Sequence, residues 1–444
     1  MSRPSFPFEV RSADIARIAV PASIAFITEP VAGLVDITVI GRLGDAAILG
    51  GVVIGALVFD FIFSLAYFLR IGTGGLTAQA VGARDQHDGL VHVTRAIVVA
   101  VIAGIAMILL QEPLRWLALT LMAPGPEVAA GFADYFAVRI WAAPFALTNY
   151  ALLGWFYGRA AATTGMALQM VMHGVNIALS IGLVHGLGWG VSGVALATLA
   201  GSVISCGVGL ALLLRHFGGP KALLARIDRQ ALLDPAGLSR MFGLSRDLMI
   251  RSIALMSAYA VFAAQGARMG AVPLASNAIL LNLLMISAFF LDGMAQAAEQ
   301  LCGKAVGANW RPAFDRAYRL SFLWGTGMAV ALGLLTLTGG GLLVDFMTTS
   351  EPVRAYARDM LPLATFAMLL SMPGFLYDGI LTGVTLNQMM RNGMLASLLV
   401  FLAALFALQG LGSTGLWLAL ASWFVARAAY YWWGLQRRRD SLFA

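Results

Sequence analysis

Long apolar runs recur along the whole chain, and they constrain its fold more than any other feature. Each run is roughly 18 to 25 residues long, which is the length that an α-helix needs to cross a bilayer. Of the 444 residues, 60% are hydrophobic and 11% are charged, and the mean hydropathy is +0.83. A soluble domain is about half apolar and about a quarter charged. The sequence therefore predicts an all-α integral membrane protein.

The number of these runs predicts about twelve transmembrane helices. We expect them near residues 14–38, 48–72, 92–111, 130–152, 164–185, 191–215, 245–268, 275–300, 316–338, 355–380, 393–409 and 414–436. The N-terminus is too polar for a cleavable signal peptide, so the first helix is expected to remain in the protein.

Basic residues gather in alternate loops, and this distribution predicts the orientation in the membrane. One side has, among others, Arg84, Lys221, Arg311 and the run 437–439, whereas the other side has few basic residues, such as Arg42 and Arg115. Cytoplasmic loops retain positive charge, so both termini should face the cytoplasm, which agrees with an even number of spans. Because the net charge of +7 follows this topology and forms no patch, we expect no nucleic-acid partner.

The chain has none of the common signatures of an enzyme. It lacks HExxH, P-loop and GxSxG motifs, and it has no cluster of histidines and cysteines. Its two cysteines, Cys206 and Cys302, both fall inside predicted spans, which argues against a disulfide framework or a cysteine metal site. A membrane enzyme that acts on lipid-linked substrates is therefore a weak alternative, and we predict no cofactor.

An internal repeat divides the chain. The stretch GRLGDAAILGG…AQAVGARD from Gly41 recurs as ARMGAVPLASN…GKAVGANW from Ala267, about 225 residues later. The sequence at 154–157 also resembles that at 374–377. We expect two pseudo-symmetric lobes of six helices, at residues 1–215 and 241–444, joined by a cytoplasmic linker at 216–240. Two similar halves favour alternating access to a site near the membrane midplane, as in a transporter.

Two acidic residues lie at membrane depth in the first predicted helix. Glu29 and Asp36 are seven residues apart and hence on one helical face. Acids inside a membrane are rare and usually mark an ion or substrate path. The alternative is that neighbouring helices satisfy both acids, which then only hold the bundle together.

Four separated motifs resemble the multidrug and toxic compound extrusion (MATE) family, in particular its DinF-like branch. They are PVAGLVDITVIGRLG from Pro30, FLRIGTGGLTAQAVGA from Phe68, LDGMAQAAEQLCGKAVGA from Leu291 and FLYDGILTGVTLNQMMRN from Phe375. The resemblance covers nearly the whole chain. It implies the twelve-helix MATE fold and the export of amphipathic, often cationic, organic molecules in exchange for protons or sodium ions. It also implies a multi-pass protein of the bacterial cytoplasmic (inner) membrane.

The resemblance also assigns candidate site residues. Asp36 matches the titrating aspartate of the first helix, and Pro21 matches the proline at which that helix bends. Three residues match polar positions of the N-lobe cavity: Asn149, Asn176 and Thr198. This chain departs from the family at Ser180, where many members have an acid. We hypothesise that Glu29 replaces that acid, so that two carboxylates share one proton.

The coupling ion has two candidates. A low-dielectric site favours the neutral form of a carboxyl group, so Asp36 can exchange a proton for a cationic substrate. Sodium is the rival, since Asp36, Asn176, Ser180 and Thr198 also offer hard oxygen ligands. We expect no other metal site.

Further residues have two interpretations each. Pro21 and Pro30 either let the first helix bend or are static kinks. His173 is either a second titrating group or a hydrogen-bonded residue of the bundle. Met256 and Met285 either line a cavity that accepts different cations or face lipid and other helices. For three acids of the C-lobe motifs we favour gating or packing: Asp292, Glu299 and Asp378.

A lipid or lipid-linked flippase is the closest alternative function, because its two-lobe architecture would look alike. Such a protein usually needs a cationic cavity for phosphates, whereas the leading intramembrane residues here are acids. The expected partners are thus small organic cations and the lipid bilayer, and one chain with a complete cleft is sufficient as a monomer.

Overall fold

The structure is a computed structural model that describes residues 4–227, 230, 232 and 234–443. The described chain divides into two compact units, which we describe separately. The N-terminal unit contains residues 24–77 and 85–241, and the C-terminal unit contains residues 1–23, 78–84 and 242–444. The lobe boundaries predicted above stay a prediction. Residues 228–229, 231 and 233 of the predicted linker lie outside the described residues.

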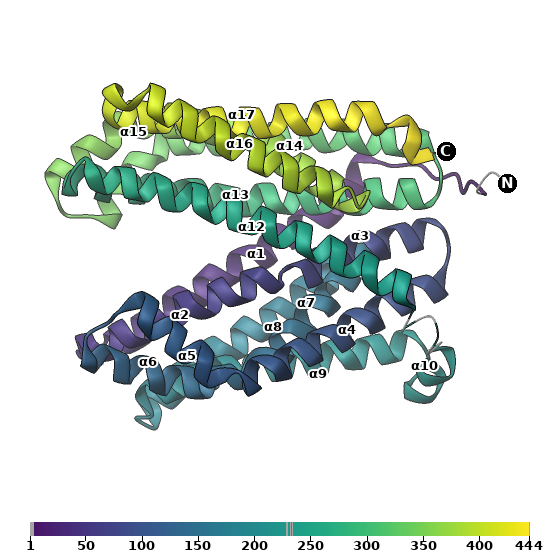
Figure 1. The fold of residues 1–444 in the computed structure, drawn as a ribbon, viewed down its shortest axis with the longest axis horizontal. Helices are drawn as coiled ribbons and strands as arrows, with labels where there is room; N and C mark the ends of the chain where they lie inside the picture. The colour runs from purple at the N-terminus through teal and green to yellow at the C-terminus, as the bar shows by residue number, and fades with distance from the viewer. Residues whose placement is uncertain (1–3, 228–229, 231, 233, 444) are drawn as a thin grey trace. The chain divides into compact units, whose positions relative to one another are not determined.

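Helices form almost all of both units (Figure 1). Three helices have residues in both units: α1 (Ser12–Gly41), α3 (Phe68–Gly82) and α12 (Pro235–Arg268). The others of the N-terminal unit are α2 (Ala46–Ala66), α4 (Gln86–Leu109), α5 (Gln111–Met122), α6 (Pro126–Arg139), η1 (Ile140–Ala142), α7 (Ala143–Gly158), α8 (Ala162–Ile181), η2 (Gly182–Gly186), α9 (Gly190–His216) and α10 (Pro220–Arg226). Those of the C-terminal unit are α13 (Ala271–Gly307), α14 (Arg311–Met347), α15 (Glu351–Gly383), α16 (Asn387–Ala407), η3 (Gln409–Leu411), α17 (Gly412–Arg438) and η4 (Asp440–Phe443).

The helices account for the predicted spans. In the described part of the chain, 11 helical stretches are long and apolar enough to cross a membrane. The last predicted span corresponds to α17, which has 27 residues. Two spans are interrupted: α2 and α3 together form the stretch Ala47–Gly82, and α6, η1 and α7 form the stretch Pro126–Gly158. The predicted twelve-helix architecture is therefore confirmed.

An aromatic core holds the N-terminal unit together. The helix α2 packs against α6, α4 against α7, and α8 against α9. The rings of Phe59, Phe132 and Phe136 are buried in this core. The ring centroid of Phe136 lies 5.2 Å from that of Phe59 and 5.5 Å from that of Phe132. Cys206 of α9 is also buried in this unit. Between helices in a membrane, close van der Waals packing of this kind is the main attraction, so this core fixes the helices that position the site.

The C-terminal unit has its own core. The helix α13 packs against α14 and α15, and α17 packs against α15 and α16 (Figure 1). Trp417 is fully buried, lies edge-on to Phe262 at 5.1 Å, and donates its indole N–H to Asn277 Oδ1 at 2.9 Å. Cys302 of α13 is buried in this unit. The indole therefore has a partner for its only polar atom, as a buried tryptophan requires.

The repeat is visible in corresponding turns of the two halves of the sequence. Arg84 and Asn309, about 225 residues apart, both adopt a left-handed backbone conformation, with φ of 57° and 47°. Glycines repeat at the same spacing: Gly154 closely approaches the carbonyl of Arg70, and Gly379 closely approaches that of Ala295. This spacing corrects the predicted match of 154–157 with 374–377, because the close helix contact of Gly154 is repeated by Gly379 and not by Gly374.

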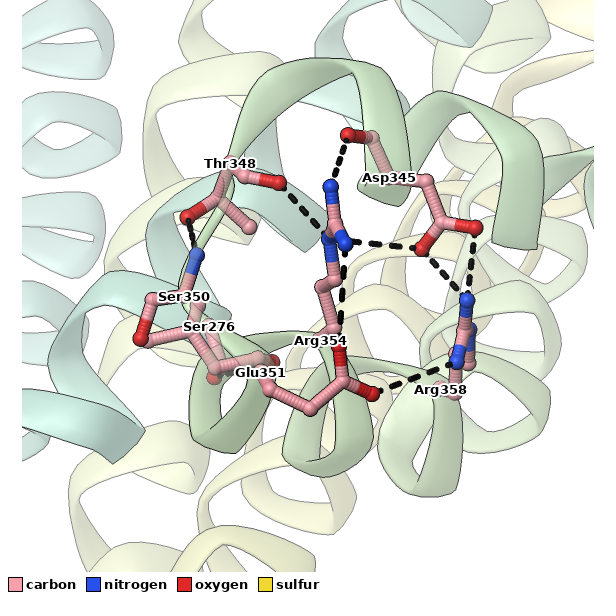
Figure 2. A network of polar contacts seen from close by, with 8 residues as sticks. Ser276, Asp345, Thr348, Ser350, Glu351, Arg354 and Arg358 are labelled. Atoms are coloured by element: carbon pink, nitrogen blue, oxygen red, sulfur yellow. Dashed lines mark hydrogen bonds and ion pairs between the residues drawn. The ribbon is translucent and has the colours of Figure 1, made fainter.

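A polar network closes the turn between α14 and α15 (Figure 2). Asp345 accepts hydrogen bonds from Arg358 Nη2 at 2.5 and 2.6 Å, and its backbone carbonyl accepts one from Arg354 Nη2 at 2.9 Å. Arg354 Nε also donates at 2.8 Å to the carbonyl of Thr348, the residue that directly follows α14. Glu351 lies 3.6 Å from Arg354. The network thus ties the end of α14 to the first two turns of α15.

Candidate functional site

A hydrogen-bonded carboxylate lies in the N-terminal unit. Asp36, on α1, is half-buried, and each of its oxygens accepts a hydrogen bond from α8. Ser180 Oγ donates to Oδ1 at 2.6 Å, and Asn176 Nδ2 donates to Oδ2 at 3.3 Å. Asn176 and Ser180 are one helical turn apart on α8 and are both buried. Both donors are neutral, so they orient the carboxylate without cancelling its charge.

Thr198 of α9 completes this arrangement. Its Oγ1 accepts a hydrogen bond from Asn176 Nδ2 at 2.9 Å and donates to the carbonyl of Val194 at 3.1 Å. Three helices thereby meet around one carboxylate. The structure brings together Asp36, Asn176, Ser180 and Thr198, the four residues predicted from the sequence to take part in cation coupling. Their role in coupling stays a prediction.

The amide of Asn176 is oriented with its nitrogen toward both Asp36 and Thr198. Its oxygen is buried and has no hydrogen-bond partner among the described residues. A sodium ion held by Asp36, Asn176 and Thr198 would need the amide oxygen on the side where the nitrogen now lies. Among the described residues, no three histidines, cysteines, aspartates or glutamates form a metal-binding group.

Arg139, the last residue of α6, interacts electrostatically with three acids of the membrane-spanning helices α1 and α2. It is within electrostatic range of Asp36, Glu29 and Asp60. Its guanidinium lies 5.7 Å from the ring centroid of Phe59, which belongs to the aromatic core. This arginine therefore supplies a positive field beside the candidate site, and no ion pair joins it to Asp36 among the described residues.

Glu29 lies in a different environment from Asp36. Glu29 is exposed, and the charged groups within its electrostatic range are Asp60, Arg70 and Arg139. Among the ion pairs and hydrogen bonds of the described residues, none joins Glu29 to Asp36. The position of the missing acid is occupied by the hydroxyl of Ser180. That Glu29 substitutes for this acid stays a hypothesis.

The other predicted residues of the N-terminal unit lie nearby on α7 and α8. Asn149 is buried, and its Nδ2 donates to the carbonyl of Ser202 at 2.9 Å and lies 3.8 Å from Met172 Sδ. His173 is half-buried, and its Nε2 has no hydrogen-bond partner among the described residues. Asn149 is thus held by the neighbouring helix, whereas one nitrogen of His173 is available.

The predicted residues on α1 and in the C-terminal unit are spread more widely. Both prolines lie within the continuous helix α1, with Pro21 half-buried and Pro30 exposed. Met285 packs against the core of the C-terminal unit, and Met256 is half-buried in the same unit. The proposed bending and cavity roles of these four residues stay predictions.

An ionic cluster lies inside the C-terminal unit. Asp378 of α15 accepts a hydrogen bond from Arg251 Nη2 of α12 at 2.6 Å, and Arg427 Nη1 of α17 lies 3.7 Å from the same oxygen. Asp292 of α13 is within electrostatic range of Arg251. Glu299 is buried farther along α13. The cluster joins four helices, which is compatible with the packing role favoured for these acids.

Comparisons with known proteins identify the family. A family model described as MatE matches residues 21–181 and 248–407, one segment in each half of the chain. The chain belongs to the MatE family. This is the multidrug and toxic compound extrusion family that the four sequence motifs resemble. As a member of this family the protein is a multi-pass membrane transporter and not an enzyme.

Two curated relatives and one solved structure illustrate the similarity. The chain is 33% identical to the DNA damage-inducible protein F of Escherichia coli over 410 residues, which cover 92% of this chain and 89% of that protein. It is 26% identical to a probable multidrug resistance protein NorM of Burkholderia mallei, over 96% and 89% of the two chains. A MATE family transporter solved in an outward-facing conformation has a TM-score of 0.87 at 19% identity, over 98% and 97% of the chains, and shares the fold.

Proposed function

We propose that this MATE transporter exports amphipathic organic cations in exchange for protons. The observation that carries the proposal is the environment of Asp36, whose two oxygens accept hydrogen bonds from the neutral donors of Ser180 and Asn176. An ionised carboxylate held in this way keeps its negative charge and a fixed orientation. A proton or an organic cation can each neutralise that charge.

Competition for one carboxylate explains how exchange is obligatory. A proton bound to Asp36 removes the charge that attracts the organic cation, and a bound cation disfavours protonation. The two ligands therefore lower each other's affinity by the same factor. We take it that the protein changes from inward-facing to outward-facing, or back, only when Asp36 carries a proton or an organic cation. A proton carried inward must then leave Asp36 before an organic cation can bind there and be carried outward. Alternating access then converts a proton gradient into export.

The orientation of Asn176 supports protons over sodium as the coupling ion. Its amide nitrogen is already shared between Asp36 and Thr198, and a proton on Asp36 needs no rearrangement of that amide. A sodium ion at the same place would require the amide to turn around and Thr198 to present a lone pair to the metal.

We also propose a location and a topology. The alternation of basic loops supports cytoplasmic termini, and the bacterial relatives support the inner membrane. Because the Asp36 arrangement is formed within one unit of one chain, a monomer is sufficient for it.

Transport of ethidium by inverted membrane vesicles tests the proposal. An imposed pH gradient should drive ethidium accumulation by the wild type, and an imposed sodium gradient should not. Asp36→Asn should lower the initial rate at least tenfold, because the amide can neither release a proton nor attract a cation. Glu127→Gln, which removes an exposed acid at the start of α6, is the matched control and should transport normally. Transport by Asp36→Asn at the wild-type rate would overturn the proposal.

One further variant and one further measurement test the role of Glu29 and the identity of the coupling ion. If Glu29 shares the proton with Asp36, Glu29→Gln should change both the rate and its pH profile, and an unchanged profile would reject that role. Dependence of the wild type on the sodium gradient alone would assign sodium as the coupling ion.

A further inference from the structure

An aromatic cage surrounds the guanidinium of Arg70 in the N-terminal unit. The Arg70 Cζ atom lies 4.4 Å from the ring centroid of Tyr67, 4.7 Å from that of Phe26 and 5.7 Å from that of Tyr157. These rings come from α1, from the junction of α2 and α3, and from α7. All three distances are within the range of cation–π attraction. We use the term aromatic cage for Phe26, Tyr67 and Tyr157.

The cage is held in place independently of Arg70. Phe26 and Tyr157 are buried and lie 6.1 Å apart, and the Tyr157 hydroxyl donates to Gln169 Oε1 at 3.3 Å. Tyr67 lies edge-on to Tyr150, with ring centroids 5.4 Å apart. Rings fixed by their neighbours lose little conformational freedom when a ligand binds, which favours affinity.

Tyr67 and Arg70 lie at the break in the second span. The helix α2 ends at Ala66 and α3 begins at Phe68, and the Arg70 amide donates to the Tyr67 carbonyl at 3.1 Å. The backbone of Tyr67 keeps helical angles, with φ of −61° and ψ of −16°, so residues 67 and 70 stay on neighbouring positions of one face.

A negative charge and partly exposed residues are both present at the cage. Glu29 follows Phe26 by one turn of α1, is exposed, and is within electrostatic range of Arg70. Tyr67 and Arg70 are half-buried, whereas the rings of Phe26 and Tyr157 are buried. Aromatic faces beside a carboxylate are the features by which proteins recognise organic cations.

Arg427 of the C-terminal unit provides a comparison. It also lies near three rings, with centroid distances of 5.4 Å to Phe375, 5.4 Å to Trp423 and 5.7 Å to Phe424. However, its side chain is only 2% exposed and lies 3.7 Å from Asp378. Arg427 is therefore enclosed, whereas Arg70 and Tyr67 are each half-buried as residues.

We propose that the aromatic cage is a subsite for organic cations and that Arg70 fills it when no substrate is bound. The ligands that suit it are flat, delocalised cations, such as alkylguanidinium ions and aromatic quaternary amines, because these match the guanidinium already held there. The subsite is distinct from Asp36, which follows Phe26 by ten residues and hence by about 15 Å along α1. This inference rests on one part of the proposed function, namely that the protein exports organic cations. It does not depend on which ion drives the export.

Equilibrium binding of ethidium to the purified protein in lipid nanodiscs tests the cage. Arg70→Gln should bind ethidium about tenfold more tightly than the wild type, because no internal cation competes. Arg70→Lys keeps the charge and should bind close to the wild type. Tyr67→Leu should weaken binding about fivefold or more, whereas Tyr67→Phe, the matched control that keeps the ring, should not. In the Arg70→Gln background, added butylguanidinium should compete with ethidium.

The outcomes separate this inference from the proposed function. Equal affinity of the wild type, Arg70→Gln and Tyr67→Leu would overturn the cage, even if the pH-driven transport by wild type and its loss in Asp36→Asn uphold the proposed function. Absence of ethidium binding to every variant would overturn it as well. If Arg70→Gln fails to fold, the comparison of Tyr67→Leu with Tyr67→Phe decides the question. Binding changes as expected, together with transport by Asp36→Asn at the wild-type rate, would uphold the cage and reject the coupling role of Asp36.

Discussion

Neutralising Asp378 should destabilise the C-terminal unit strongly. The side chains of Asp378 and Arg251 are 12% and 13% exposed, and that of Arg427 is 2% exposed. In Asp378→Asn two buried guanidinium groups lose their shared carboxylate. Removal of one partner of a buried pair costs roughly 3 to 5 kcal/mol, and we expect about 3 kcal/mol because the amide oxygen still accepts one hydrogen bond. For a unit of about 200 residues this lowers Tm by about 6 to 12 °C.

Thermal unfolding in detergent, followed by size-exclusion chromatography of the heated protein, measures this effect. The double variant Arg251→Gln/Asp378→Asn removes one charge of each sign, and it should recover more than half of the lost Tm. An Asp378→Asn protein that unfolds within about 2 °C of the wild type would refute the reasoning. So would a double variant that is no more stable than the single one, since the loss would then not come from an unpaired charge.

Three further substitutions have expected outcomes in the same assay. Gly307→Ala should lower stability by about 1 to 3 kcal/mol, because a Cβ would overlap a carbonyl of α3, whereas Gly327→Ala, which has open space around it, should be neutral or stabilising. Asp345→Asn should cost no more than about 1 kcal/mol, and the difference should vanish in molar salt, because its ion pairs are partly exposed. Asn277→Ala should cost about 1 to 3 kcal/mol and shift the tryptophan fluorescence, because the buried indole N–H of Trp417 loses its acceptor; an unchanged Tm and spectrum would contradict this.

The apolar periodicity predicted the spans well and their interruptions poorly. The predicted spans 164–185 and 191–215 correspond closely to α8 with η2 and to α9. The break at Tyr67 was not predicted, since no proline or glycine lies between residues 56 and 71 and most residues around it are apolar. Predicted ends such as 275–300 fall short of α13, which continues to Gly307. Hydropathy detects the length of a helix inside the bilayer and not its polar extension.

The arrangement around Asp36 could be predicted from the sequence, but the aromatic cage could not. The spacing of Asn176 and Ser180 by one turn places both on one face of a helix, and family resemblance connected that face to Asp36. The aromatic cage was not predictable. Phe26, Tyr67 and Tyr157 are far apart in the sequence, and an aromatic residue in an apolar helix gives the same signal whether it faces lipid or a guanidinium.

The two buried cysteines have a practical consequence for experiments on the transport cycle. Cys206 and Cys302 are the only thiols in the sequence, and neighbouring helices enclose both. A maleimide dye or a nitroxide spin label added to the folded wild type should therefore find no reactive sulfur. Pairs of cysteines introduced at the surface can then be labelled selectively, and distances between the labels can be followed during turnover while every native residue is retained.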